Sequence, residues 1–398
     1  MLAVCVKYVS CIAAEMERSH VQTMKENPML KDFYELTALE VYSKKERAIC
    51  DVMKKKLTDL GLEVTEDDTA EKTGSECGNI IAVLKGDPDI EPILFSCHLD
   101  RVPNNGHIHP QLDEKEMIMY SDKKTILAAD DVSGICVMLQ ALRNVKEKNL
   151  KHGDIEVILS TCEEIGLYGA DNADLKKFKA KMCFVFDIPG RAGRIVKQAP
   201  GMGKVVITVH GKKAHAGNEP EKGLNALRVT ADLIMHLPDG RLSPFTTANF
   251  AMITGGPAAN VVCDKVVLQG EHRSSELSEF IETQDKIRAA VKEISEKYNT
   301  PIDLELTEMF KTFNIPEDAP VCRIAAKACR NVGLTPFFDR GGGGMDGNVF
   351  NKHGITTIGI APGYEKNHTS DELLHVEDMF KCGEEATEFI KIVASGEY

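Results

Sequence analysis

Short apolar runs alternate along most of this chain with stretches in which apolar residues recur at helical spacing. The apolar runs are of strand length and rich in β-branched residues; they cover residues 79–84, 92–97, 155–160 and 182–186. Helical spacing marks residues 43–61 and 132–145. In the first helix, Ser43 and Glu46 have the spacing of a capping box, and Gly61 is placed to end it. This alternation predicts a mostly parallel sheet with helices on both faces.

The pattern of apolar residues changes after residue 200. The pattern there predicts the order βαββαβ, typical of a ferredoxin-like α+β domain, with elements at residues 205–209, 221–237, 247–254, 261–271, 276–298 and 302–306. Strands and helices alternate again from residue 320. We therefore expect one discontinuous α/β domain, residues 25–200 and 314–398, interrupted by an inserted α+β domain, residues 201–313. Residues 1–24 are expected to be an N-terminal extension.

Composition narrows the class of protein. The chain has 398 residues and a formal charge of -13, which argues against nucleic acid or an anionic membrane as a partner. No apolar run approaches the roughly 20 residues that a membrane-spanning helix needs. The 12 cysteines are scattered without a Cys-x-x-Cys pair, as expected of reduced thiols in a cytoplasmic protein.

Residues that can bind metals or protons follow several of the predicted strands. The run 155–160 leads into Glu163 and Glu164, and the run 92–97 ends in the sequence His98-Leu99-Asp100. Asp130 precedes a predicted helix, whereas Asp187 and the late His368 each follow a predicted strand. Open α/β sheets build their sites at this carboxyl edge, so we expect these side chains to lie together.

Each of these residues has an ordinary explanation when taken alone. A lone pair of glutamates suits a solvated turn, a lone histidine suits a core, and a lone aspartate suits a helix cap. Together they offer two imidazoles and several carboxylates, a ligand set that suits zinc, cobalt or manganese. Two ions with one bridging carboxylate need five ligands, and such a pair lowers the pKa of a shared water and polarises a carbonyl. The member of the Glu163/Glu164 pair that binds no metal would then take the proton, and Asp100 would orient His98.

Several motifs resemble one family in order along the chain. HLD, AADD-x-x-G, STCEE-x-G, VFD and the tail GGGGMDGNVFNKHGI…GYEKNHTSDE are similar to those of the co-catalytic di-zinc exopeptidases. That family includes peptidase T, glutamate carboxypeptidase, aminoacylase and succinyl-diaminopimelate desuccinylase. The tail most resembles the peptidase T-like tripeptide aminopeptidases, and the match runs from about Met29 to the C-terminus.

The resemblance implies a role for each motif residue. One zinc would be bound by His98, Asp130 and Asp187, and the other by Asp130, Glu164 and His368. Glu163 would be the general base and Asp100 the orienting acid. The inserted domain would serve as a lid and as the contact of a homodimer. Its His215 would stabilise an oxyanion in the partner's site, while Asn260 and Arg273 would bind substrate.

Two positions depart from the family pattern. Val132-Ser133 stands where relatives often have Lys-Ala, and Arg101 stands where they often have Thr. Neither removes a ligand, but Arg101 follows the HLD motif directly and is expected to alter a substrate subsite.

The sequence thus predicts a cytoplasmic di-zinc hydrolase of short peptides, most specifically a tripeptide aminopeptidase. An N-acyl amino-acid deacylase or a carboxypeptidase on the same di-metal site remains the alternative. A peptide-binding protein with a dead site is disfavoured, because a binder has no need of Glu163. A cysteine nucleophile at Cys162 is disfavoured too, because metal-ligand residues explain its surroundings.

Overall fold

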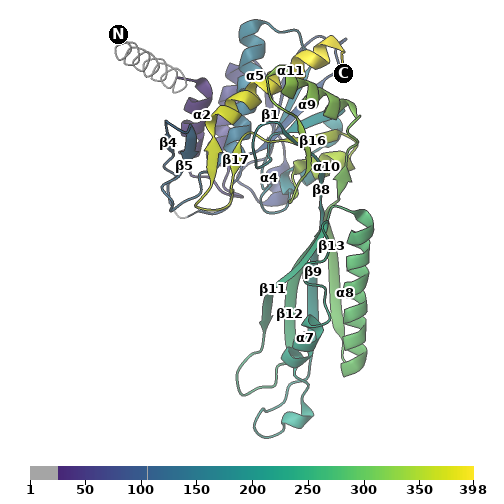
Figure 1. Ribbon diagram of the computed structural model, residues 1–398. Coiled ribbons are helices and arrows are strands. Elements are labelled where there is room, and N and C mark those ends of the chain that lie inside the picture. The colour runs from purple at the N-terminus through teal and green to yellow at the C-terminus, as the bar shows by residue number, and fades with distance from the viewer. Residues whose placement is uncertain (1–25, 105) are drawn as a thin grey trace, which may run out of the picture. The chain divides into compact units, whose positions relative to one another are not determined.

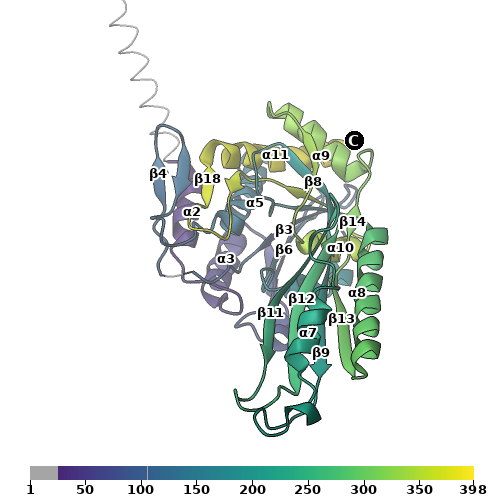
Figure 2. The same ribbon diagram turned by 60° about the horizontal axis from the view of Figure 1, so that its bottom comes forward.

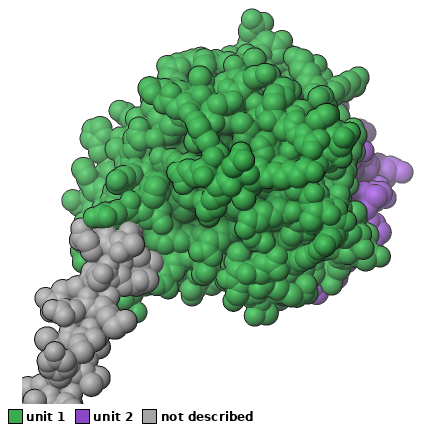
Figure 3. Space-filling view, turned by 90° about the horizontal axis from the view of Figure 1, so that it is seen from above, with its two compact units in different colours: residues 1–197, 315–339, 345–398 green, residues 198–314, 340–344 purple. Residues whose placement is uncertain are grey.

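The computed structural model describes residues 26–104 and 106–398, so the expected extension at residues 1–24 lies outside the described residues. The chain forms two compact units, coloured separately in Figure 3. Unit 1 comprises the described residues up to Lys197 together with Ile315–Asp339 and Met345–Tyr398. Unit 2 comprises Gln198–Asn314 and Arg340–Gly344.

Unit 1 is built on a mixed sheet whose centre is parallel. Its strands run in the order β1-β2-β6-β3-β7-β16-β8, with β15 also pairing with β8. They are β1 (Glu63–Glu66), β2 (Ile80–Leu84), β3 (Ile93–His98), β6 (Ile155–Ser160), β7 (Met182–Val185), β8 (Arg194–Ala199), β15 (Phe337–Arg340) and β16 (Thr356–Ile360). The short β14 (Phe313–Asn314) pairs with the end of β8. The expected mostly parallel α/β sheet is confirmed.

The four central strands β6, β3, β7 and β16 are mutually parallel. Their carboxyl ends therefore lie side by side, because parallel strands point the same way. His98 pairs with Ser160 at the ends of β3 and β6. This edge of the sheet is where the candidate site residues emerge.

Helices cover this sheet, and α5, α9 and α11 lie close together in both ribbon views (Figures 1 and 2). The helices of unit 1 are α2 (Pro28–Thr37), α3 (Arg47–Asp59), α4 (Thr69–Thr73), α5 (Ala129–Lys148), α6 (Tyr168–Asn172), η1 (Leu175–Lys177), α9 (Pro320–Asn331), α10 (Asp346–Lys352) and α11 (Val376–Ser395). Phe389 of α11 stacks on Phe184 of β7 with ring centroids 4.2 Å apart. Burying one such side chain contributes about 1.5–3 kcal/mol, so this packing fixes the strands beneath the site.

The predicted capping box at Ser43 and Glu46 is wrong. Helix α3 begins at Arg47, and no side chain caps it. The Ser43 hydroxyl donates to Asp100 Oδ2 at 2.6 Å, and the Glu46 carboxylate accepts the Cys162 amide at 3.1 Å. Ser43 thus makes a tertiary contact instead of a capping bond, and Glu46 makes a tertiary contact besides a local one, since its Oε1 also accepts the Lys44 amide at 2.8 Å. The predicted end is confirmed, because Gly61 follows the helix with a φ of 98°.

A second, smaller sheet lies in unit 1 and was not expected from the sequence. Its strands run in the order β17-β18-β5-β4. They are β4 (Gln111–Asp113), β5 (Ile118–Tyr120), β17 (Tyr364–Glu365) and β18 (Leu373–His375). Strands β17 and β18 pair antiparallel, and the residues between them, 366–372, form a connection that carries His368.

Unit 2 has the predicted βαββαβ order with one short strand, β10, added before β11. Its antiparallel sheet runs β10-β11-β12-β9-β13, and α7 and α8 both pack against it. The elements are β9 (Gly201–His210), η2 (Pro220–Lys222), α7 (Ala226–Ile234), β10 (Gly240–Arg241), β11 (Thr246–Gly255), β12 (Lys265–Ser274), α8 (Leu277–Tyr298) and β13 (Ile302–Phe310). Helix α7 is shorter than the predicted 221–237, because Asn225 caps it by accepting the Leu227 amide at 3.0 Å. Within the described residues, no helix is long and apolar enough to cross a membrane.

Candidate active site

His98 is held in one ring orientation at the end of β3. It is almost fully buried, and its Nδ1 lies 3.0 Å from the backbone carbonyl of Asp100. A carbonyl only accepts, so Nδ1 carries the proton and the Nε2 lone pair is free. Nε2 lies 2.9 Å from Asp130 Oδ1 and 3.7 Å from Asp187 Oδ1. The imidazole therefore presents a metal-binding nitrogen to two carboxylates.

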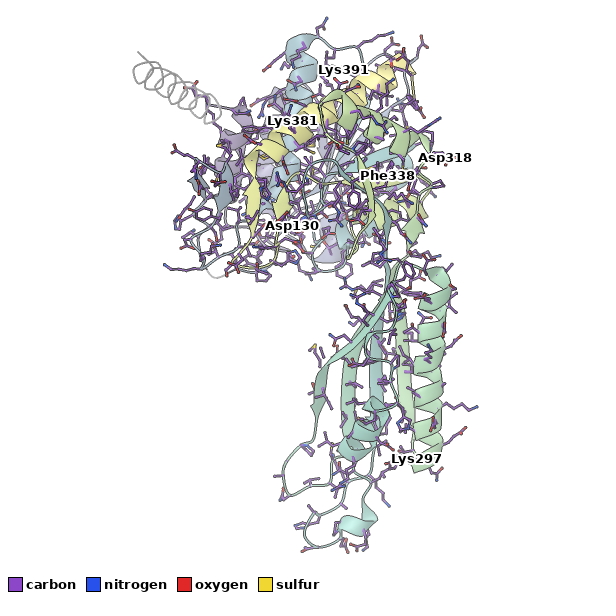
Figure 4. The ribbon with its side chains drawn as sticks, viewed as in Figure 1. Asp130, Lys297, Asp318, Phe338, Lys381 and Lys391 are labelled. Atoms are coloured by element: carbon purple, nitrogen blue, oxygen red, sulfur yellow. The ribbon has the colours of Figure 1, made fainter. Side chains whose placement is uncertain are left out.

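Asp130 stands between two imidazoles. It is part of the first turn of α5, in unit 1 (Figure 4), and its peptide bond to Asp131 is cis. Its Oδ1 faces His98, while its Oδ2 lies 3.2 Å from His368 Nε2. His368 Nε2 also lies 2.9 Å from Glu164 Oε1. One carboxylate thus faces both halves of the predicted ligand set.

The spacing of these donor atoms suits shared metal ions. Two ligands at about 2.1 Å from a tetrahedral ion lie roughly 3.4 Å apart. The contacts that join the five predicted ligands span 2.9 to 3.7 Å. Ligand atoms of His98, Asp130 and Glu164 lie within 4.8 Å of one another, as do those of His98, Glu163 and Asp187. Nitrogen and carboxylate oxygen donors in this arrangement fit zinc, cobalt or manganese.

The charge at the site also fits a cation. Burial, followed by the neighbouring Asp130, raises the pKa of Asp187 to about 7. Burial and Asp187 likewise raise the pKa of Glu163 well above its ordinary value. Among the described residues, the ion pairs of Asp130, Glu164 and Asp187 involve only His98 and His368. Crowded carboxylates without lysine or arginine partners leave negative charge for a metal to neutralise.

Asp100 holds the turn that carries the two glutamates. Its Oδ1 accepts the Glu163 amide at 2.9 Å, and its Oδ2 accepts the Glu164 amide at 3.2 Å. Its Oδ1 also lies 3.6 Å from His98 Nδ1, whose hydrogen bond goes to the Asp100 backbone carbonyl, so the expected role of this carboxylate in orienting His98 stays a prediction. Asp100 therefore links β3 to the acidic turn after β6.

Comparison with known proteins identifies the family. Residues 79–219 match a family described as peptidase family M28, and residues 199–299 match a peptidase dimerisation domain. The crystal structure of the aminopeptidase PepT from Bacillus cereus ATCC 10987 is 38% identical to this chain, with a TM-score of 0.84. The match covers 92% of this chain and 98% of that one. The chain belongs to the peptidase T family.

Two further relatives extend this peptidase T assignment. A tripeptidase from Staphylococcus aureus subsp. aureus mu50 is 29% identical with a TM-score of 0.86, covering 92% of this chain and 98% of that one. The uncharacterised protein YqjE of Bacillus subtilis (strain 168) is 37% identical over 93% of this chain and its own whole length. The resemblance seen in the motifs is thus confirmed, and the chain is a peptidase.

Three site residues predicted for this peptidase T chain lie in unit 2. His215 and Asn260 are exposed and adjacent, since the Ala216 amide donates to the Asn260 carbonyl at 3.0 Å. His215 Nδ1 accepts the amides of Gly217 and Asn218, each at 3.1 Å. When neutral, this ring therefore carries its proton on the outward Nε2. Arg273 lies on β12, where its guanidinium pairs with Glu271 at 2.8 Å.

Arg101 is not part of a substrate subsite, contrary to our expectation. Its side chain is fully buried and donates to the Leu36 carbonyl at 2.7 Å and the Leu39 carbonyl at 3.0 Å. It thus adds donors to carbonyls at and just beyond the end of α2, where the Leu36 carbonyl also accepts the Leu39 amide at 3.2 Å. A cavity of about 330 Å³ lies there, lined by residues 38–42, 103, 104 and 106–108, and none of the predicted ligands lines it.

Cys162 is unsuited to be a nucleophile, as predicted. It is buried, and burial together with Glu46 raises the pKa of its thiol to about 12. A thiolate, which is the reactive form, is therefore disfavoured at neutral pH.

Sequence reasoning missed several residues that contact the predicted ligands or the strand ends beside them. Asn367 donates to Asp130 Oδ2 at 2.6 Å, and the Tyr364 hydroxyl donates to Asp187 Oδ1 at 2.9 Å. Asp131 Oδ2 accepts the His98 amide at 3.1 Å. Asp346 is buried and contacts the Ser160 hydroxyl. All four residues lie inside the motifs given in the sequence analysis. A sequence alone does not distinguish a metal ligand from a residue that holds a ligand in place.

Proposed function

We propose that this peptidase T-family protein is a metal-dependent aminopeptidase that releases the N-terminal residue of tripeptides and similar short peptides. The observation that carries the proposal is the grouping of five nitrogen and oxygen ligands around Asp130, with a buried glutamate beside them. Similarity to an aminopeptidase and to a tripeptidase supports the substrate class.

The ligands would divide between two ions that share Asp130. His98, Asp130 and Asp187 would hold one ion, and Asp130, Glu164 and His368 would hold the other. The contacts of 2.9 Å from His98 to Asp130 and 3.2 Å from His368 to Asp130 support a bridging carboxylate. We assign zinc to both positions, because imidazole and carboxylate ligands without thiolate suit it.

Glu163 serves as the general base. Bound divalent ions supply a water of lowered pKa and a polarised substrate carbonyl. The Glu163 carboxylate is buried within 4.8 Å of the ligand atoms of His98 and Asp187, and Asp100 fixes its backbone. It takes the proton of the attacking water and returns it to the leaving amine. Burial raises the pKa of Glu163 above its ordinary value, which makes this carboxylate a stronger base.

His215 donates a hydrogen bond to the developing oxyanion in the partner's site, and Asn260 and Arg273 contact the substrate. Two amides at Nδ1 direct the proton of His215 to Nε2, which gives the ring an outward donor. One such donor is worth about 2.7–4 kcal/mol of transition-state stabilisation.

The protein acts as a homodimer joined by the edge of unit 2 formed by β11. Beyond residue 250 this strand is exposed and includes Met252 and Ile253. The opposite edge, β13, instead carries Asp303, Glu305 and Glu308. Charged residues protect an edge from pairing, whereas an apolar edge invites it. The match of residues 199–299 to a dimerisation domain supports this arrangement.

The compartment is the cytoplasm. The ten described cysteines are free and buried, from Cys50 to Cys382. Free thiols persist where the environment is reducing.

Hydrolysis of a tripeptide and of its N-acetylated form tests the proposal. The metal-loaded protein should release the first residue of the free tripeptide, and acetylation should lower kcat/KM at least about tenfold, the effect of roughly 1.4 kcal/mol. A carboxyl-amidated tripeptide is the matched control and should remain a substrate. Preference for the acetylated form would favour the deacylase, and loss of activity on amidation alone would favour the carboxypeptidase.

A further inference from the structure

Glu372 is a buried acid that belongs to no role assigned so far. It lies in the connection between β17 and β18, four residues after His368, and its side chain is 0% exposed. Its Oε2 accepts the amides of Leu127 at 2.7 Å and Ala128 at 2.9 Å. Its Oε1 accepts the amide of Asp130 at 3.1 Å. One carboxylate thus satisfies three backbone donors in the segment that leads into the bridging aspartate.

That segment needs an external support. Ala128 has a φ of 61°, in the left-handed region that is unfavourable for a residue with a Cβ. Leu127, Ala128 and Ala129 are fully buried, so water cannot replace the bonds made by Glu372. An unfavourable backbone conformation persists only where its surroundings enforce it. Glu372 is the carboxylate that does so here.

The same short connection also holds the side chain of Asp130. Asn367 donates to Oδ2 at 2.6 Å, and His368 Nε2 lies 3.2 Å from that oxygen. Both the backbone and the carboxylate of Asp130 are therefore fixed by residues 367–372. Glu372 acts on the backbone, because its hydrogen bonds go to backbone amides and not to the imidazole of His98 or His368.

We infer that Glu372 is a positioning residue, which sets the orientation of Asp130 before any metal binds. This inference rests on the proposed role of Asp130 as the shared ligand of two ions. A ligand that is already oriented loses little conformational freedom when it binds a metal. The support by Glu372 should therefore raise the affinity for metal.

Glu372→Gln tests this inference with little change in size. The new amide group must place a donor against a backbone donor, so at least one of the three bonds is lost. We expect metal affinity, measured by equilibrium titration of the apoprotein with Zn²⁺, to fall 10- to 100-fold. Hydrogen exchange at Leu127, Ala128 and Asp130 in the apoprotein should become faster.

The matched control is Glu385→Gln. Glu385 is also 0% exposed, but it accepts a bond from the Cys329 thiol on α9 instead of from the Asp130 segment. This control should leave both the metal affinity and those three exchange rates unchanged, even if it lowers the melting temperature. Circular dichroism confirms that each variant is folded.

Three results would separate the possible failures. Wild-type protein without measurable zinc affinity would overturn the proposed function, and the exchange rates would still test whether Glu372 holds the segment. Wild-type affinity with an unchanged value in Glu372→Gln would overturn the role of Glu372 alone. If Glu372→Gln does not fold, Glu372→Asp replaces it as the test. The shorter side chain keeps the charge but moves the oxygens away from the three amides. It should therefore also weaken zinc binding.

Discussion

Each oxygen of Asp130 faces a different histidine, which makes this aspartate the residue common to both parts of the site. The two glutamates that follow β6 divide in the same way. Glu164 contacts His368, whereas Glu163 makes no contact with either histidine among the described ion pairs. Adjacent residues at a turn thus occupy two different environments. This difference supports the proposed assignment of Glu164 as a metal ligand and Glu163 as the base.

Substitution of each glutamate by glutamine should separate metal binding from proton transfer. Glu163→Gln should keep two metals and lose about 10²- to 10⁴-fold in kcat, because a base contributes roughly that factor. Glu164→Gln should instead lose metal, since an amide is a poorer ligand than a carboxylate. Elemental analysis of the dialysed proteins, together with kcat on a tripeptide, measures both effects.

His215→Ala provides the comparison for these two variants. This variant should keep the metal content of the wild type and have a lower kcat, as we expect of Glu163→Gln. It should do so even though His215 lies in unit 2. If Glu163→Gln loses metal and Glu164→Gln keeps it, then Glu163 is the ligand and Glu164 the base, the reverse of our assignment.

At the scale of elements, the sequence predicted the strands and helices that periodic patterns of apolar residues encode. The parallel strands, the βαββαβ unit and the emergence of ligands at strand ends follow from local spacing and from the geometry of parallel sheets. The errors came from residues whose partners are distant in sequence. Ser43 contacts Asp100, 57 positions away, and Arg101 caps α2, 65 positions away. A local pattern cannot show such partners, and for the same reason it did not reveal Glu372 as the support of Asp130.

The two edges of the unit 2 sheet should respond differently to charge. Ile253→Lys on β11 should make the protein monomeric at micromolar concentration, because a charged edge disfavours strand pairing. The matched control, Glu305→Lys, places the same side chain on β13 and should leave the dimer intact. Light scattering after size-exclusion chromatography measures both masses. Dissociation by Glu305→Lys alone would move the interface to the other edge.

At the scale of the whole molecule, unit 2 is inserted in the sequence between Asp187 and His368, two proposed ligands that belong to unit 1. The chain leaves unit 1 after Lys197 and returns at Ile315, so each unit has its own core. The core of unit 2 contains one unusual group. His272 is 0% exposed, its ring packs on Phe280, and neither ring nitrogen has a partner among the described residues.

Unit 2 should therefore lose stability in acid. Burial, aided by Arg288 and opposed by Glu271, lowers the pKa of His272 to about 4. An unfolded chain has a histidine pKa of about 6.5. Between these values the unfolded state binds a proton that the folded state does not, so the free energy of unfolding falls as pH drops.

Melting curves from pH 7 to pH 4 on wild type and His272→Leu measure this effect. The leucine variant removes the titrating group and should show a shallower decline in the transition of unit 2. Equal slopes for the two proteins would assign the acid sensitivity to other groups.

The support of Asp130 by residues near the end of the chain has a consequence for synthesis. Asn367 lies 237 positions after Asp130, and a ribosome that adds roughly 5–20 residues per second needs about 12–47 s to cover that distance. During this interval the emerging polypeptide has Asp130 but lacks His368, Asn367 and Glu372. A prematurely terminated product would lack them permanently. Capture of both proposed ions would thus wait until translation had passed Glu372, and metal loading would report that residues 367–372 had been made.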